Sequence, residues 1–93
     1  MGKFSVNKLP SDVLISTASN TAALRKELKL TQADLSVKSG VSYGSIKRFE
    51  RTGRISFESL LKIAEALERL SDFEELLLPK GNKKVEDLFK SYQ

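Results

Sequence analysis

Cysteine and histidine are both absent from the 93-residue sequence. Without them the chain cannot form disulfides, thiolate or imidazole metal sites, thiol nucleophiles or a Ser-His-Asp triad. The carboxylates that remain are spread along predicted helices and form no cluster, so we expect neither an enzyme nor a cofactor. These absences favour a binding protein over an enzyme.

Long apolar runs are missing as well. The N-terminus lacks the run of about 7 to 15 apolar residues found in signal peptides, and no stretch approaches the roughly 18 apolar residues of a membrane-spanning helix. We therefore expect a cytoplasmic protein. Hydrophobic residues make up 40% of the chain and charged residues 30%, which is ordinary globular composition. A chain of this length suffices for one domain with a single core.

The positive charge is concentrated in the first part of the chain. The net charge is +4; residues 1–54 contain 10 Lys and Arg against 4 Asp and Glu, whereas residues 55–93 contain 6 against 8. Each phosphate that a basic side chain neutralises releases condensed counterions, so such a region favours binding to nucleic acid of any sequence. A solvated basic face that binds nothing is the alternative interpretation.

Hydrophobic spacing, capping residues and breakers predict an all-α chain of five or six short helices. We expect a loose N-terminal segment over 1–9, a helical domain over 10–78, and a linker with a short C-terminal helix over 79–93. Ser56 and Ser71 are the predicted caps of the fourth and fifth helices. The expected helices run from just after Pro10 towards Lys29 with a break allowed near Asn20, then over Gln32–Ser39, Tyr43 to about Arg51, Phe57 to about Arg69, Asp72–Leu77, and around Val85, Leu88 and Phe89.

The stretch from Thr31 to Glu50 indicates two short helices joined by a tight turn. Thr31 and Ser42 can cap the two helix starts, and Gly40 can supply the positive φ of the turn. The two helices must cross closely, so the positions that face inwards should be small or apolar. Ser39 departs from this pattern, because an apolar residue is more usual at its position. The positions that fit are Leu35, Ser36, Val41, Ile46 and Phe49. This layout is typical of a DNA-reading helix-turn-helix, although an ordinary helical hairpin in a small bundle has similar features.

Residues 24–77 strongly resemble the XRE family of phage Cro and repressor-type DNA-binding domains. The matching segments are Leu24-Arg25, Leu30-Thr31-Gln32, Gly40-Val41-Ser42, Ile46, Arg48-Phe49-Glu50-Arg51 and Ser59-Leu60-Leu61-Lys62-Ile63-Ala64. The resemblance implies a compact lambda-repressor-like bundle that binds double-stranded DNA and regulates transcription, with a repressor as the expected role. Two alternatives stay open: an antitoxin that binds a toxin protein and represses its own operon, and a protein-interaction module that does not bind DNA.

The resemblance also implies roles for individual residues. The helix that begins at Tyr43 would enter the major groove, and an ion pair between Arg25 and Glu50 would tie the first helix to it. The expected base contacts are Tyr43, Gly44 and Lys47, and the expected phosphate contacts are Gln32, Ser42, Ser45, Arg48, Arg51 and Arg54.

Two further expectations concern the end of the first helix and the oligomeric state. Lys29 stands where a glycine often ends the first helix in the family. A homodimer on a two-fold operator is expected, because one domain of this size covers few base pairs. Its candidate surfaces are the Phe73–Leu78 region and the predicted Val85–Phe89 helix.

Overall fold

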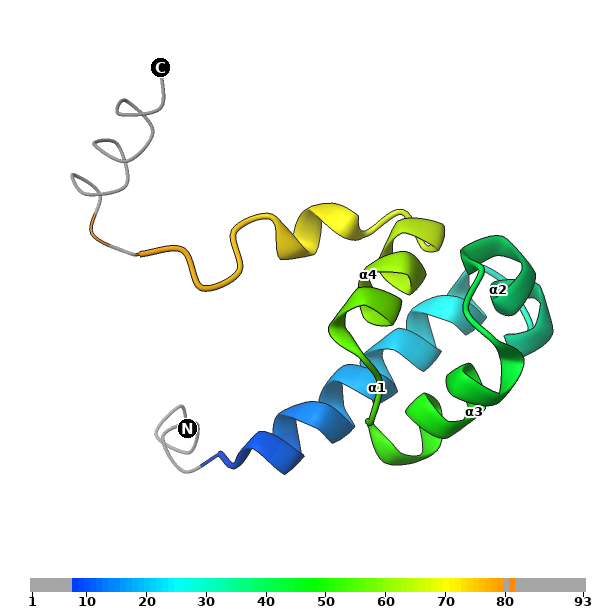
Figure 1. The fold of residues 1–93 in the computed structure, drawn as a ribbon, viewed down its shortest axis with the longest axis horizontal. Coiled ribbons are helices and arrows are strands. Elements are labelled where there is room, and N and C mark those ends of the chain that lie inside the picture. The colour runs from blue at the N-terminus through cyan, green and yellow to red at the C-terminus, as the bar shows by residue number, and fades with distance from the viewer. Residues whose placement is uncertain (1–7, 80, 82–93) are drawn as a thin grey trace, which may run out of the picture.

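A computed structural model describes residues 8–79 and 81 and shows an all-helical domain (Figure 1). The elements are α1 (Pro10–Glu27), α2 (Gln32–Ser39), α3 (Tyr43–Thr52), α4 (Phe57–Ala66) and the short 3₁₀ helix η2 (Leu70–Phe73). The described residues thus contain four α-helices and no strand, which confirms the predicted all-α class with a helix count slightly below the expected five or six.

Side-chain caps fix the starts of α2, α3 and α4. Thr31 Oγ1 accepts a hydrogen bond from the Asp34 amide at 2.9 Å, and Asp34 Oδ2 accepts one from the Thr31 amide at 2.9 Å. This reciprocal capping box satisfies two helix-end donors, and the bonds from the backbone and side chain of Thr31 hold the pKa of Asp34 below its ordinary value. Ser42 and Ser56 cap α3 and α4 without a reciprocal bond, each accepting an amide hydrogen bond at 3.1 Å.

The turn between α2 and α3 is held by serine hydroxyls and a left-handed glycine. Gly40 has φ = 80°, a conformation that costs glycine little because it has no Cβ. Ser36 Oγ donates to the Val41 carbonyl at 2.7 Å, and Ser39 Oγ accepts from the Val41 amide at 3.0 Å. Ser39 therefore stabilises the turn although an apolar residue was expected at its position.

The core lies where the helices of the motif cross. Its fully buried large side chains are Leu35 from α2, Ile46 and Phe49 from α3, and Ile63 from α4. The loop after α3 approaches α1 closely at Gly53, which has φ = 83°; a Cβ there would lie 2.8 Å from the carbonyl carbon of Leu14. This contact and the shared core hold α3 in a fixed orientation against the rest of the domain.

The first helix is continuous, so the break allowed near Asn20 does not occur. Thr21 Oγ1 donates to the Thr17 carbonyl at 2.7 Å, a bond that lets a threonine stay within a helix. α1 ends at Glu27, two residues before the expected end. Lys29 follows with φ = 62°, the left-handed conformation for which a glycine would be the usual residue.

The sequence prediction is less accurate beyond α4. This helix ends at Ala66 rather than near Arg69, because Glu68 turns left-handed at φ = 61° and the Arg69 amide bonds back to the Ala64 carbonyl at 2.8 Å. The predicted helix over Asp72–Leu77 is wrong. Short-range i to i+3 bonds replace α-helical bonds from Asp72 to Leu78, and Ser71 does not cap η2. The predicted helix around Val85, Leu88 and Phe89, and residues 1–7 of the N-terminal segment, lie outside the described residues.

Candidate nucleic-acid interface

α3 is amphipathic, with one face in the core and the opposite face in solvent. Ile46 and Phe49 are buried, whereas Tyr43, Lys47 and Arg48 are exposed. Residues three and four apart lie on the same side of a helix, so the buried pair fixes which side chains face outwards. The three residues expected to meet bases therefore share the outer surface of α3 at its first turns.

The outward side of α3 carries an ordered pair of side chains at its start. The Lys47 ammonium nitrogen lies 5.0 Å from the centroid of the Tyr43 ring, within the range of a cation–π contact. Gly44 lies between them in sequence, and a Cβ built on it would meet no heavy atom within 4 Å. The surface beside the pair is therefore open to a close approach by a ligand.

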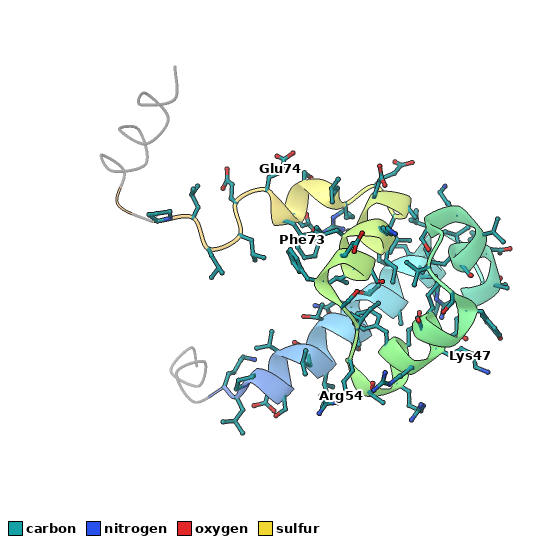
Figure 2. All side chains as sticks on the ribbon, in the orientation of Figure 1. Lys47, Arg54, Phe73 and Glu74 are labelled. Atoms are coloured by element: carbon teal, nitrogen blue, oxygen red, sulfur yellow. The ribbon has the colours of Figure 1, made fainter. Side chains whose placement is uncertain are left out.

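Three arginines extend this surface to the end of α3 and beyond. Arg48, Arg51 and Arg54 are all exposed. Thr52 Oγ1 donates to the Arg48 carbonyl at 2.8 Å and accepts from the Arg54 amide at 3.1 Å, so the chain that carries Arg54 is tied to the last turn of α3. Lys47 and Arg54 both lie on the side of the domain formed by α3 in Figure 2.

The hydroxyl residues at the start of α3 are already hydrogen-bonded to each other. Ser42 Oγ donates to Ser45 Oγ at 2.8 Å while accepting from the Ser45 amide. Both side chains are exposed, and the Ser45 hydroxyl still has its own hydrogen to donate to an anion.

Gln32 is placed differently from the other expected phosphate contacts. Its side-chain amide nitrogen donates to Glu50 Oε1 at 2.8 Å, and the residue is only partly exposed. The side chain therefore holds Glu50, and what Gln32 offers an anion is its place at the start of α2, where backbone amides point outwards.

Arg25 and Glu50 form an ion pair between α1 and α3. Arg25 Nε lies 2.7 Å from Glu50 Oε2 and Nη2 lies 3.0 Å from Oε1, while Nη1 donates to the Leu30 carbonyl at 2.8 Å. The two side chains are only 9% and 10% exposed. Burial by itself would raise the pKa of Glu50, but the hydrogen bonds from Arg25 and Gln32 outweigh it and hold that pKa below its ordinary value. The same hydrogen bond from Arg25 to Glu50 raises the pKa of Arg25 above its ordinary value.

Two of these contacts were not expected from the sequence. The stacking of Lys47 on Tyr43 could have been anticipated, because the residues are four apart on a helix. The bond between Gln32 and Glu50 spans 18 residues and two helices, and no local pattern indicates it.

The described helices include none that is both long and apolar enough to cross a membrane. A helix-turn-helix family model matches residues 22–73, more than half of the chain and all of the region from the middle of α1 to η2. No curated protein and no solved structure matches the chain.

Proposed function

The chain belongs to the XRE-type helix-turn-helix family of DNA-binding regulators, and from this we propose that it represses transcription by placing α3 in the major groove of a two-fold operator. The observation that carries the proposal is the outer face of α3, where Lys47 and Tyr43 are exposed as an ordered pair beside three exposed arginines. An α-helix fits the width of the major groove of B-DNA.

Base reading is assigned to Tyr43, Gly44 and Lys47. The Lys47 ammonium can donate to the O6 and N7 acceptors of guanine, and the Tyr43 ring can contact a thymine methyl group. Gly44 has no side chain to read a base. Its open surroundings let the helix approach the groove closely, at some cost in helix propensity.

Phosphate binding is assigned to the residues around this face. Arg48, Arg51 and Arg54 supply charge, while Ser42 and Ser45 supply hydroxyls at the start of α3 and Gln32 contributes from the start of α2. Contacts to phosphates set the position of a protein on the duplex and carry little sequence information. Their strength depends on salt, because binding releases counterions.

Dimerisation is the second part of the proposal, with the Phe73–Leu78 region as the contact surface. Within it, Leu76 is 52% exposed and Leu77 is 94% exposed, and burying such side chains against another chain is favourable. Two copies would double the number of base pairs contacted.

The same two leucines support the second candidate function, an antitoxin that binds a toxin protein through this region and represses its own operon. Purification of the chain with the product of the neighbouring reading frame distinguishes the two functions. A stable one-to-one complex formed through Leu76 and Leu77 supports the antitoxin, and a chain that only self-associates supports the homodimeric repressor.

Selection of bound duplexes from a random pool tests the DNA-binding proposal. We expect an enriched two-fold sequence whose affinity falls steeply between about 50 and 200 mM salt. Lys47→Ala should relax the preference at one position of each half-site, and Arg51→Ala should weaken all sequences alike and reduce the salt slope by about 1. A pool that yields no common sequence, or exchanged effects of the two variants, would contradict the assigned roles.

A further inference from the structure

A groove runs along α1 on the side that faces α4. Two cavities of about 310 Å³ and 200 Å³ adjoin there, because Thr17 and Leu60 line both of them. The larger cavity extends to Leu24 and the smaller one to Val13. The α1–α4 groove, defined by these two cavities, therefore follows α1 for about three turns, or roughly 17 Å at 1.5 Å per residue.

The smaller cavity is lined mainly by apolar side chains, and the larger one also by Asn20, Thr21, Arg69 and Asp72. The rim of the groove carries Phe57 and Phe73, whose ring centroids lie 6.1 Å apart in an edge-to-face arrangement. Phe57 is more than half exposed, and Figure 2 shows Phe73 directed towards α1. Residues 55–79 contain six Asp and Glu against two Lys and Arg. The two charged residues of the lining, Arg69 and Asp72, pair with each other at 2.9 Å, so an occupant with an apolar face is the best complement.

The C-terminal sequence of the same chain has such an apolar face. In NKKVEDLFKSYQ, residues 82–93, the apolar Val85, Leu88 and Phe89 follow the i, i+3, i+4 spacing of one helix face. Residues 80–93 contain four lysines against two acidic residues, the opposite balance to that of residues 55–79. Twelve helical residues span about 18 Å, which matches the length of the groove.

The point of attachment favours the chain's own tail over a second copy. Phe73 lines the larger cavity, and only a few residues separate it from Pro79 and Gly81, residue types that reverse the chain direction readily. A segment on a short tether has an effective concentration in the millimolar range, far above that of a separate molecule at micromolar concentration.

We propose that residues 82–93 fold back as an amphipathic helix and bury Val85, Leu88 and Phe89 in the α1–α4 groove of their own chain. A three-turn helix is marginal in water unless it packs against another surface, and the groove supplies that surface. Lys47 and Phe73 lie on different sides of the domain in Figure 2, so a tail docked beside Phe73 leaves the face of α3 that carries Lys47 free to meet DNA.

A nitroxide label on the full chain tests the proposal. The sequence has no cysteine, so Ser91→Cys provides a single attachment point. We expect the amide signals of Thr17, Leu24 and Leu60 to lose most of their intensity through paramagnetic broadening, while that of Lys47 loses much less. Equal broadening of all four amides, or none, overturns the proposal.

A mixed sample separates docking within a chain from docking between chains. Spin-labelled chain at natural isotope abundance is mixed with nitrogen-15-labelled chain that carries no nitroxide. Both chains carry Leu76→Asp and Leu77→Asp, so that contact through the proposed dimer surface does not bring a second nitroxide near the groove. Docking within one chain predicts no broadening of the groove amides in this sample. Broadening there would assign the groove to the tail of a second copy and overturn the proposal.

A charge-matched variant then identifies the buried face of the tail. Leu88→Asp combined with Phe89→Asp should abolish the broadening at Thr17 and Leu60, while the amide dispersion of α1 to α4 shows that the domain is still folded. Lys83→Asn combined with Lys90→Asn makes the same change of −2 in net charge on the opposite face of the helix and should keep the broadening. Broadening that survives the double substitution would show that this face does not dock.

Discussion

The guanidinium of Arg25 meets the carboxylate of Glu50 side on, with paired N–O distances of 2.7 Å and 3.0 Å. This geometry joins α1 to the end of α3, and both side chains are about nine-tenths buried. Bidentate pairs of this kind are among the stronger polar contacts in proteins, although desolvation of the two charges offsets much of their attraction. The pair therefore fixes the orientation of α3 more than it adds net stability.

Removing one member of this pair should destabilise the domain more than removing both. Arg25→Met leaves the Glu50 carboxylate buried without its main partner, so we expect the free energy of unfolding to fall by about 3 to 5 kcal/mol. Arg25→Met combined with Glu50→Leu leaves no orphaned charge and should cost less than the single substitution. Urea unfolding of the parent chain, the two single variants Arg25→Met and Glu50→Leu, and the double variant measures the coupling between the two side chains. Additive effects of the two substitutions would contradict a direct pair.

The same pair should make stability depend on acid pH. The pKa of Glu50 is lower in the folded chain than in the unfolded one, so its contribution to stability is complete above the unfolded pKa of about 4.3 and is lost as the pH falls through the folded pKa. Glu50→Gln removes this contribution. The gap in unfolding free energy between the parent chain and this variant should therefore be wide at neutral pH and narrow in acid.

Asp34 does not affect the outcome of the pH experiment. Its pKa is also lowered in the folded chain, but it is present in both the parent chain and the Glu50→Gln variant and so cancels from their difference. A gap of the same size at pH 3 and pH 7 would show that Glu50 does not cause the acid sensitivity.

Replacing Lys29 with glycine should stabilise the domain. Lys29 has φ = 62°, a left-handed conformation that costs a residue with a Cβ roughly 1 to 2 kcal/mol; glycine avoids this cost but loses part of the gain through its greater unfolded-state entropy. We expect a net increase of about 1 kcal/mol in the free energy of unfolding. Lys38→Gly, the same change within α2, should instead destabilise by about 1 kcal/mol. Equal effects of the two substitutions would show that the Lys29 conformation carries no strain.

The parts of the fold that the sequence predicted well are those fixed by local contacts. α2 begins and ends at the predicted residues because Thr31 caps its start and Gly40 ends it. The end of α4 and the form of η2 were predicted wrongly. α4 ends at a left-handed turn whose residue is Glu68 rather than the usual glycine. In η2, Phe73 packs on Phe57 of α4, a contact that no local pattern indicates.

The candidate site divides in the same way. The exposure of Lys47 and Arg48 follows from helical spacing once Ile46 and Phe49 are placed in the core. The hydrogen bond from Gln32 to Glu50 does not follow from helical spacing, because the fold brings together the two helices that carry these residues. The pairing of Arg25 with Glu50 was expected from family resemblance, and spacing alone does not indicate it.

The contact between Tyr43 and Lys47 leads to a prediction about which part of the tyrosine matters for reading DNA. If the ring holds the lysine ammonium in place, Tyr43→Phe should keep the base preference at the position proposed for Lys47, because the ring face remains. Tyr43→Leu removes the ring and should weaken that preference about two- to fivefold, since an exposed cation–π contact contributes about 0.5 to 1 kcal/mol.

Competition between the selected operator and a copy changed at one base pair measures this preference for the parent chain and both variants. Lys47→Ala is the reference, because without the lysine the ring has nothing to position, and Tyr43→Leu added to Lys47→Ala should change the preference at that base pair no further. If Tyr43→Phe instead lowers the preference as much as Tyr43→Leu, the hydroxyl rather than the ring face acts at that base pair, and the cation–π contact does not position Lys47.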